Sequence, residues 1–140
     1  MVPKSGYKIF DKVISKKTSI HLFNIVNRLC QFYSPEIFNK KKYKNNWIDI
    51  EFNKKLINLR KKNRKVFAAI YDTLLKSNAL NKFCYDNKFD IVAAKFLGVN
   101  KDYLTIRSCT LRMDVPNDRR NLYGWHQDSA YDNFNTSSTN

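Results

Sequence analysis

Glycine and proline are scarce in this chain, since each occurs only three times in 140 residues. These two residues mark tight turns, and an all-β protein needs many such turns. The scarcity therefore predicts that most of the chain is helical. Hydrophobic residues make up 43% of the sequence and aromatic residues 14%, which is enough to build the core of one ordinary domain.

Apolar residues recur at helical spacing in the first 98 residues, which we expect to be mainly helical. Residues 1–15 are ambiguous between a strand and a short helix. Ser19 is a candidate N-cap for a helix that runs to about Tyr33. Pro35 follows closely and ends this helix, because proline cannot continue the hydrogen-bonded backbone.

A second apolar stripe begins at Trp47 or Asp49. It fits either one long helix or two helices joined near Asn63. Ser77 is a candidate N-cap for a short helix after this stripe. A last helix is expected over about residues 90–97. We interpret all these stripes as packing faces of helices rather than as cofactor sites.

The composition changes after Gly98, a residue type that is common just past a helix end. The segment from Tyr103 to Val115 is rich in β-branched and aromatic residues without a helical period, which predicts one long strand or two short ones. Pro116, Asn117 and Asp118 have turn chemistry and end this segment. A further strand is expected from Leu122 to Tyr131.

That last strand contains the sequence Trp125-His126-Gln127-Asp128-Ser129-Ala130-Tyr131. Side chains two residues apart on a strand point to the same face, with Cα atoms roughly 6.6 Å apart. The imidazole of His126 and the carboxylate of Asp128 can then converge on one metal ion, while Gln127 faces the other way. They match two of the three ligands in the 2-His-1-carboxylate triad of non-haem Fe(II) oxygenases.

The order of these features resembles the phytanoyl-CoA dioxygenase family. The resemblance rests on Leu111-Arg112-Met113-Asp114-Val115-Pro116, the following loop, and the segment Trp125–Tyr131. It implies an oxygenase that depends on Fe(II) and 2-oxoglutarate, acts on a small-molecule substrate, and is built on a double-stranded β-helix, or jelly roll. His126 and Asp128 correspond to the first two iron ligands of that family.

In this family the strand before the metal motif lines the cosubstrate pocket. Cys109, Leu111 and Met113 would then face inward, and Leu111 and Met113 are the candidate cofactor-binding residues. A shift of one residue in register would turn Arg112 inward instead, where it could meet a carboxylate. The family's distal histidine ligand and its 2-oxoglutarate-binding arginine have no counterpart here, because the only other histidine is His21 in a predicted helix.

The resemblance and the residue patterns together predict an α+β fold, in which N-terminal helices precede the first strands of a truncated jelly-roll core. One incomplete domain spans residues 1–140. It comprises a mainly helical part over residues 1–98, the first core strands with the metal motif over residues 99–131, and a polar tail over residues 132–140. We expect this chain to be the N-terminal part of a dioxygenase and to be inactive alone.

A net charge of +14 raises a second class of function, because lysine and arginine neutralise the phosphates of nucleic acids. The basic residues cluster over residues 40–44, 54–55 and 60–65. However, the whole chain is rich in lysine, asparagine and isoleucine, which a coding bias explains equally well. We favour a solvated charged helix face and expect no nucleic-acid partner. The alternatives are a basic nucleic-acid-binding module with an accidental H-x-D, and a metal-free pseudoenzyme fragment.

The cysteines, Cys30, Cys84 and Cys109, are odd in number and far apart in sequence. This pattern matches neither a disulfide framework nor a zinc site, so we expect three buried thiols and a reducing compartment. The first residues lack the apolar run of a signal peptide, and no stretch is apolar enough to span a membrane. These observations predict a cytoplasmic protein without membrane association.

Overall fold

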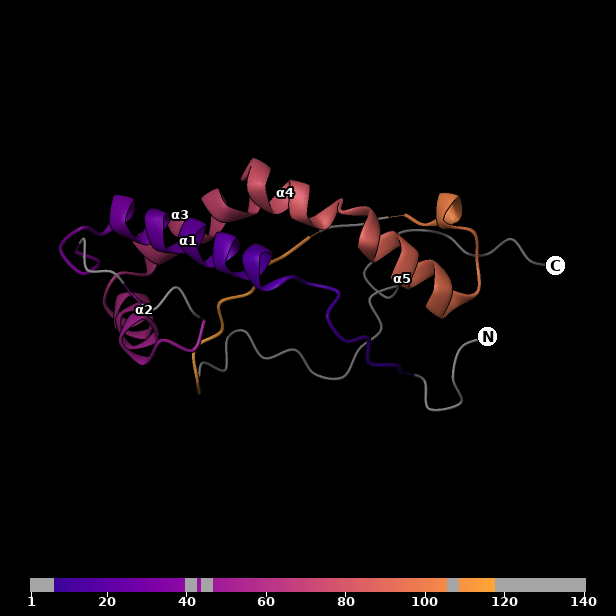
Figure 1. Cartoon of the computed structure of the whole chain (residues 1–140). Coiled ribbons are helices and arrows are strands. Elements are labelled where there is room, and N and C mark those ends of the chain that lie inside the picture. Colours follow the sequence, from indigo (N-terminus) through magenta and orange to yellow (C-terminus); the bar gives the residue numbers. More distant parts are fainter. Residues whose placement is uncertain (1–6, 40–42, 44–46, 106–108, 118–140) are drawn as a thin grey trace.

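The computed structural model describes residues 7–39, 43, 47–105 and 109–117. Within this part of the chain, regular structure is entirely helical (Figure 1). The elements, in chain order, are α1 (Lys16–Tyr33), α2 (Ile50–Lys62), α3 (Arg64–Leu75), α4 (Asn78–Cys84), α5 (Asn87–Leu97) and the short 3-10 helix η1 (Lys101–Tyr103).

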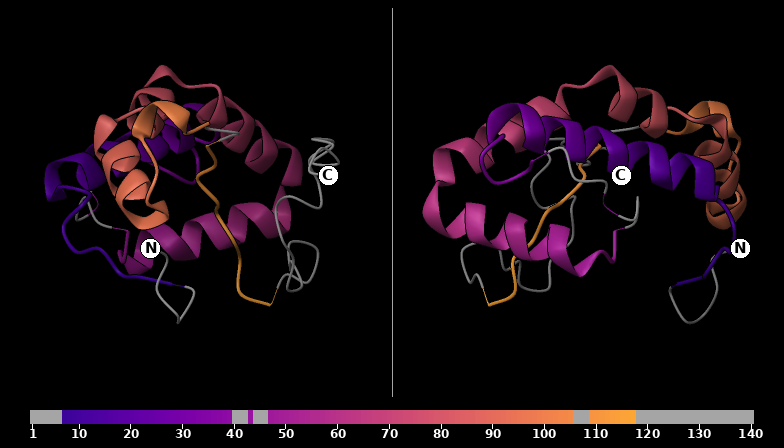
Figure 2. Two further views of the ribbon diagram at one scale, coloured as in Figure 1. Left: turned by 90° about the vertical axis from the view of Figure 1, so that its right-hand side faces the viewer. Right: turned by 60° about the vertical axis from the view of Figure 1, so that its left-hand side comes forward.

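The first four helices pack on one another, and α5 lies apart from them at one end of the molecule (Figures 1 and 2). Helix α3 contacts α1, α2 and α4, so it is the central element of the packing. Helix α5 contains no buried residue and packs mainly against η1. Its aromatic residues make edge-to-face contacts with neighbouring segments, Phe89 with Phe83 and Phe96 with Phe10.

Side-chain caps fix the beginnings of α2, α3 and α4. A carboxylate oxygen of Asp49 accepts from the Phe52 N–H at 3.0 Å, and the Ser77 hydroxyl accepts from the Leu80 N–H at 3.2 Å. Asn63 divides the long apolar stripe in two. Its backbone N–H ends α2, and its side-chain oxygen accepts the N–H of Val66 in the first turn of α3. Of the two alternatives, one long helix or two helices joined near Asn63, the structure shows the second, and it confirms the cap at Ser77.

Helix α1 begins earlier than predicted, because Ser15 rather than Ser19 is its N-cap. The Ser15 hydroxyl accepts the N–H of Thr18 at 3.0 Å. Ser19 lies within the helix instead, where its hydroxyl and its backbone carbonyl accept the indole N–H of Trp47. At the other end, buried Ser34 donates its N–H to the carbonyl of Cys30 at 2.9 Å. Helix α1 therefore stops at Tyr33, as the sequence predicts.

The end of α5 also follows the prediction. Gly98 adopts the left-handed conformation with φ 71°, and its N–H donates to the Ala94 carbonyl at 2.8 Å. A residue without Cβ reaches this conformation without a steric penalty. The start of α5 differs, since Asp86 caps it and the helix begins at Asn87 rather than near residue 90.

The core is a cluster of apolar side chains from α1 to α4 and the loop after α1. Phe52 lies at its centre. The centroid of its ring lies 4.8 Å from the ring centroid of Phe23, 5.2 Å from that of Tyr43 and 5.6 Å from that of Phe38. Such tilted and edge-to-face contacts add to the gain from burial. The buried hydrophobic residues are Leu22, Phe23, Val26, Cys30, Phe38, Tyr43, Phe52, Leu59, Phe67, Ile70, Leu74, Leu80 and Cys84.

The predicted α+β fold is wrong for the described residues, which contain no β-strand. The segment from Tyr103 to Val115 begins as the end of η1 and continues, over residues 109–117, without regular secondary structure. We call residues 109–117 the strap. The strap makes no backbone hydrogen bond with another described residue, so it has no neighbouring strand in the described part of the chain. The second predicted strand, residues 122–131, lies outside the described residues.

The physical reason for the error lies in what a β-type pattern measures. Alternating apolar and polar residues fit any half-buried extended segment, whether its neighbour is a strand or a group of helices. The strap crosses α2 (Figure 2). Its apolar side chains pack against the helical core. The apolar side chains of this segment therefore pack on helices rather than in a sheet.

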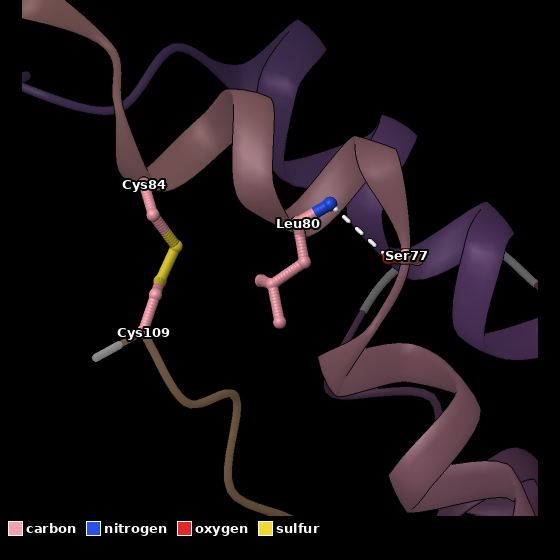
Figure 3. The surroundings of a disulfide bond; sticks show 4 residues. All are labelled: Ser77, Leu80, Cys84 and Cys109. Atoms are coloured by element: carbon pink, nitrogen blue, oxygen red, sulfur yellow. Dashed lines mark hydrogen bonds between the residues drawn. A yellow bond between two sulfur atoms is a disulfide. The ribbon is translucent and has the colours of Figure 1, made fainter.

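Cys84 and Cys109 form a disulfide, with Cα atoms 5.9 Å apart (Figure 3). The bond joins the last residue of α4 to the first residue of the strap. The expectation of three buried thiols is thus wrong for these two cysteines, and the inference of a reducing compartment loses its basis. The expectation of a buried thiol is correct for Cys30, which is free and buried. Burial raises the pKa of this thiol to about 12.

Candidate functional site

The predicted iron ligands, His126 and Asp128, lie outside the described residues, and their role stays a prediction. Within the described ranges, no group of three histidine, cysteine, aspartate or glutamate side chains is arranged to hold a metal ion. The second histidine, His21, is exposed on α1. The structure therefore provides geometry for the segment that precedes the metal motif, which is the strap, and for the helices that the strap contacts.

The strap alternates between partly buried and exposed residues. Cys109, Leu111 and Met113 pack against the hydrophobic core, whereas Arg112 and Asp114 are exposed. These last two form an ion pair, with the guanidinium Nη2 3.0 Å from the carboxylate Oδ1. Leu111 and Met113 thus lie on the core side of the strap, while Arg112 is exposed. The binding of a cosubstrate by Leu111 and Met113 stays a prediction.

A cavity of about 410 Å³ lies between the strap and the helices. This volume is within the range of small-molecule sites, which is roughly 300–1,000 Å³. Met113 lines the cavity, while Leu111 packs on the core elsewhere. Most of the wall is apolar and comes from α1, α2, α3, the residue Trp47 and the strap: Val26, Trp47, Phe52, Leu56, Ile57, Phe67, Met113, Val115 and Pro116. The polar lining residues are Asn53, Arg112 and Asp114.

Helix α2 supplies four of the lining residues among the described residues, because residues one turn apart on a helix lie on the same face. Phe52 and Leu56 are related in this way, as are Asn53 and Ile57. The Asn53 side-chain NH2 donates to the Trp47 carbonyl at 2.8 Å. The indole of Trp47 is itself bound to Ser19, so α1 and α2 together fix the position of the Trp47 side chain.

Sequence reasoning missed this cavity. The stripe of α2 was correctly interpreted as a packing face, but part of that face lines an open volume instead of a filled core. The signal available in the sequence was Asn53, a polar residue next to Phe52 and one turn before Ile57 in the apolar stripe. A single asparagine is too weak an indication to predict a cavity, because surface asparagines are common in this chain.

The basic residues near the α2–α3 junction have different local environments. Arg60 lies over the ring of Phe67, with its guanidinium carbon 5.0 Å from the ring centroid. Lys61 and Lys62 are exposed in the last turn of α2, where the helix dipole favours cations. Further back, the hydrogen bond from the Lys55 ammonium to the Tyr43 hydroxyl raises the pKa of Lys55.

Comparison with known proteins finds no match to this chain among protein-family models, curated proteins or solved structures. The resemblance to the phytanoyl-CoA dioxygenase family therefore stays a prediction that depends on the motif residues. Among the described residues, no helix is both long enough and apolar enough to cross a membrane.

Proposed function

We propose that this chain belongs to an Fe(II)- and 2-oxoglutarate-dependent dioxygenase and supplies two of its iron ligands, His126 and Asp128. The observation that supports this proposal is the order of motifs, in which Leu111–Pro116 precedes an aromatic-His-x-Asp segment. The donor chemistry fits, because an imidazole and a carboxylate together suit Fe(II) with open coordination positions. His21, the other histidine, is not assigned as a ligand.

Iron and 2-oxoglutarate, when bound, would supply the oxidative chemistry, in which 2-oxoglutarate becomes succinate and CO₂ while a C–H bond of the substrate is hydroxylated. The residues of this chain would hold the metal through the His126 ring nitrogen and an Asp128 oxygen.

The test is succinate formation from 2-oxoglutarate by the complete gene product, with Fe(II), ascorbate and oxygen present. His126→Ala and Asp128→Ala should each lower the rate by roughly 100-fold or more, because each removes a metal ligand. Gln127→Ala and His21→Ala are the matched controls and should stay within about two-fold of the original rate. Succinate formation that survives His126→Ala unchanged would show that the ligand assignment is wrong.

A second candidate function, nucleic-acid binding, is favoured by one observation at the α2–α3 junction. Lys61, Lys62, Arg64 and Lys65 are exposed and have no ion pair within the described residues. Arg64 and Lys65 lie in the first turn of α3, where the helix dipole disfavours cations. Stabilisation of the helix therefore does not explain why basic residues occupy these two positions. Replacing both with glutamine should remove about two phosphate contacts with DNA or RNA. The plot of the logarithm of the binding constant against the logarithm of the salt concentration should then become less steep by about two. Absence of any salt-dependent binding would exclude this candidate.

A further inference from the structure

The cavity beneath the strap has one wall that is attached differently from the others. Helices α1, α2 and α3 are held by helix packing and backbone hydrogen bonds, whereas the strap makes no backbone hydrogen bond within the described chain. Among the described residues, its attachments include the half-buried side chains of Leu111 and Met113 and the covalent bond from Cys109 to Cys84. Figure 3 shows that this bond fixes the start of the strap to the end of α4.

The lining of the cavity indicates which molecules it can hold. Among the described residues, its walls are mainly aliphatic and aromatic, and the two charged lining residues, Arg112 and Asp114, form an ion pair at 3.0 Å. A charged ligand would therefore lose its hydration without gaining an unpaired partner of opposite sign. Asn53 donates to Trp47, and within the described residues its amide oxygen accepts no hydrogen bond. That oxygen can accept a bond from a ligand.

We propose that this cavity binds a neutral, mainly aromatic or aliphatic small molecule with one hydrogen-bond donor, and that the Cys84–Cys109 disulfide sets the affinity. With the disulfide intact, the strap residues from Arg112 to Pro116 form a fixed wall, and a fixed wall lowers the entropic cost of binding. With the disulfide broken, this wall loses its covalent attachment to α4. The proposal does not depend on iron binding by His126 and Asp128.

The change of state is an ordinary thiol–disulfide exchange. A cellular dithiol attacks one sulfur of the disulfide, and its second thiol then releases the mixed disulfide. Two electrons and two protons pass from the dithiol to the protein, which yields thiols at Cys84 and Cys109 and a cyclic disulfide in the reductant. Cys30 takes no part, because it is buried and the pKa of its thiol is raised to about 12.

Two fluorescent probes with the same ring skeleton test the proposal on the oxidised chain. N-Phenyl-1-naphthylamine is neutral and has one N–H donor, whereas 1-anilinonaphthalene-8-sulfonate carries an added negative charge. The neutral probe should bind with about ten-fold higher affinity than the sulfonate, and reduction with dithiothreitol should weaken its binding by about ten-fold. Equal affinity before and after reduction, or no binding of the neutral probe, would overturn the proposal.

Two pairs of variants separate the cavity from other apolar surfaces. Ile57→Trp fills the cavity and should abolish binding of the neutral probe, whereas Ile91→Trp on the exposed face of α5 should leave it unchanged. Asp114→Asn removes one negative charge at the cavity, so it should strengthen sulfonate binding by about ten-fold. Asp102→Asn makes the same change of net charge on η1 and should have no such effect. A sulfonate response that is the same in both aspartate variants would contradict the site.

Discussion

Reduction of the Cys84–Cys109 disulfide should destabilise the folded chain by several kcal/mol. The two cysteines are 25 residues apart, and the bond closes that length of chain in the unfolded state. For a loop of this length, the lost conformational entropy corresponds to about 3.5 kcal/mol at 25 °C. Total stabilities of domains are about 5–15 kcal/mol, so the effect is a large share of the whole.

Urea unfolding of the oxidised and reduced chains, followed by circular dichroism, measures this difference. A denaturant dependence of roughly 2 kcal/mol per molar urea converts the loss into a midpoint shift of about 1.7 M. The same shift should appear in the Cys30→Ala variant, because Cys30 is not part of the bond. Coincident midpoints for the oxidised and reduced chains would refute the pairing, as would alkylation of Cys84 and Cys109 in the folded, unreduced chain.

Three further predictions concern the core and the helix caps. Burial raises the pKa of the Cys30 thiol from its ordinary value of 9.0 to about 12, so the stabilising effect of the buried thiol is complete below pH 9 and is lost as the pH rises through 12. The difference in unfolding free energy between the original chain and Cys30→Ala should therefore change by about 1.4 kcal/mol per pH unit above pH 9. A difference that stays constant with pH would contradict the burial of this thiol. Phe52→Ala should cost about 3–5 kcal/mol in urea unfolding, whereas Phe32→Ala, at 78% exposure, should cost less than about 1 kcal/mol; equal losses would place the core elsewhere. Asn63→Ala should cost about 1 kcal/mol through loss of the α3 cap, and exposed Asn58→Ala in α2 should cost less than half of that.

The helix boundaries that the sequence predicts correctly are those set by local chemistry. Asp49, Asn63 and Ser77 each cap the backbone N–H three residues later, and Gly98 takes up a positive φ. These interactions involve near neighbours only, so the residue type is enough to predict them. The error at the start of α1 has a different origin. Ser15 and Ser19 are the same residue type, and a distant residue, Trp47, donates its indole N–H to the hydroxyl of Ser19.

The features that the sequence does not predict depend on contacts between distant segments. The strap has the composition of a strand, but whether strands or helices cover its apolar side is decided by the whole fold. The pairing of Cys84 with Cys109 depends on the same packing, because α5 and η1 separate these residues in sequence. The cavity forms where α2 and the strap do not fill the space between them, and no spacing of residues encodes such a gap.

Metal binding by His126 and Asp128 is tested most directly by titrating the chain with Mn(II), as a redox-stable substitute for Fe(II), in the presence of 2-oxoglutarate. Electron paramagnetic resonance then reports the free and bound metal. His126→Ala and Asp128→Ala should each raise the dissociation constant by at least about ten-fold, while Gln127→Ala and His21→Ala should change it by less than about two-fold. The same dissociation constant in all four variants and in the original chain would contradict the assignment of these two residues as iron ligands.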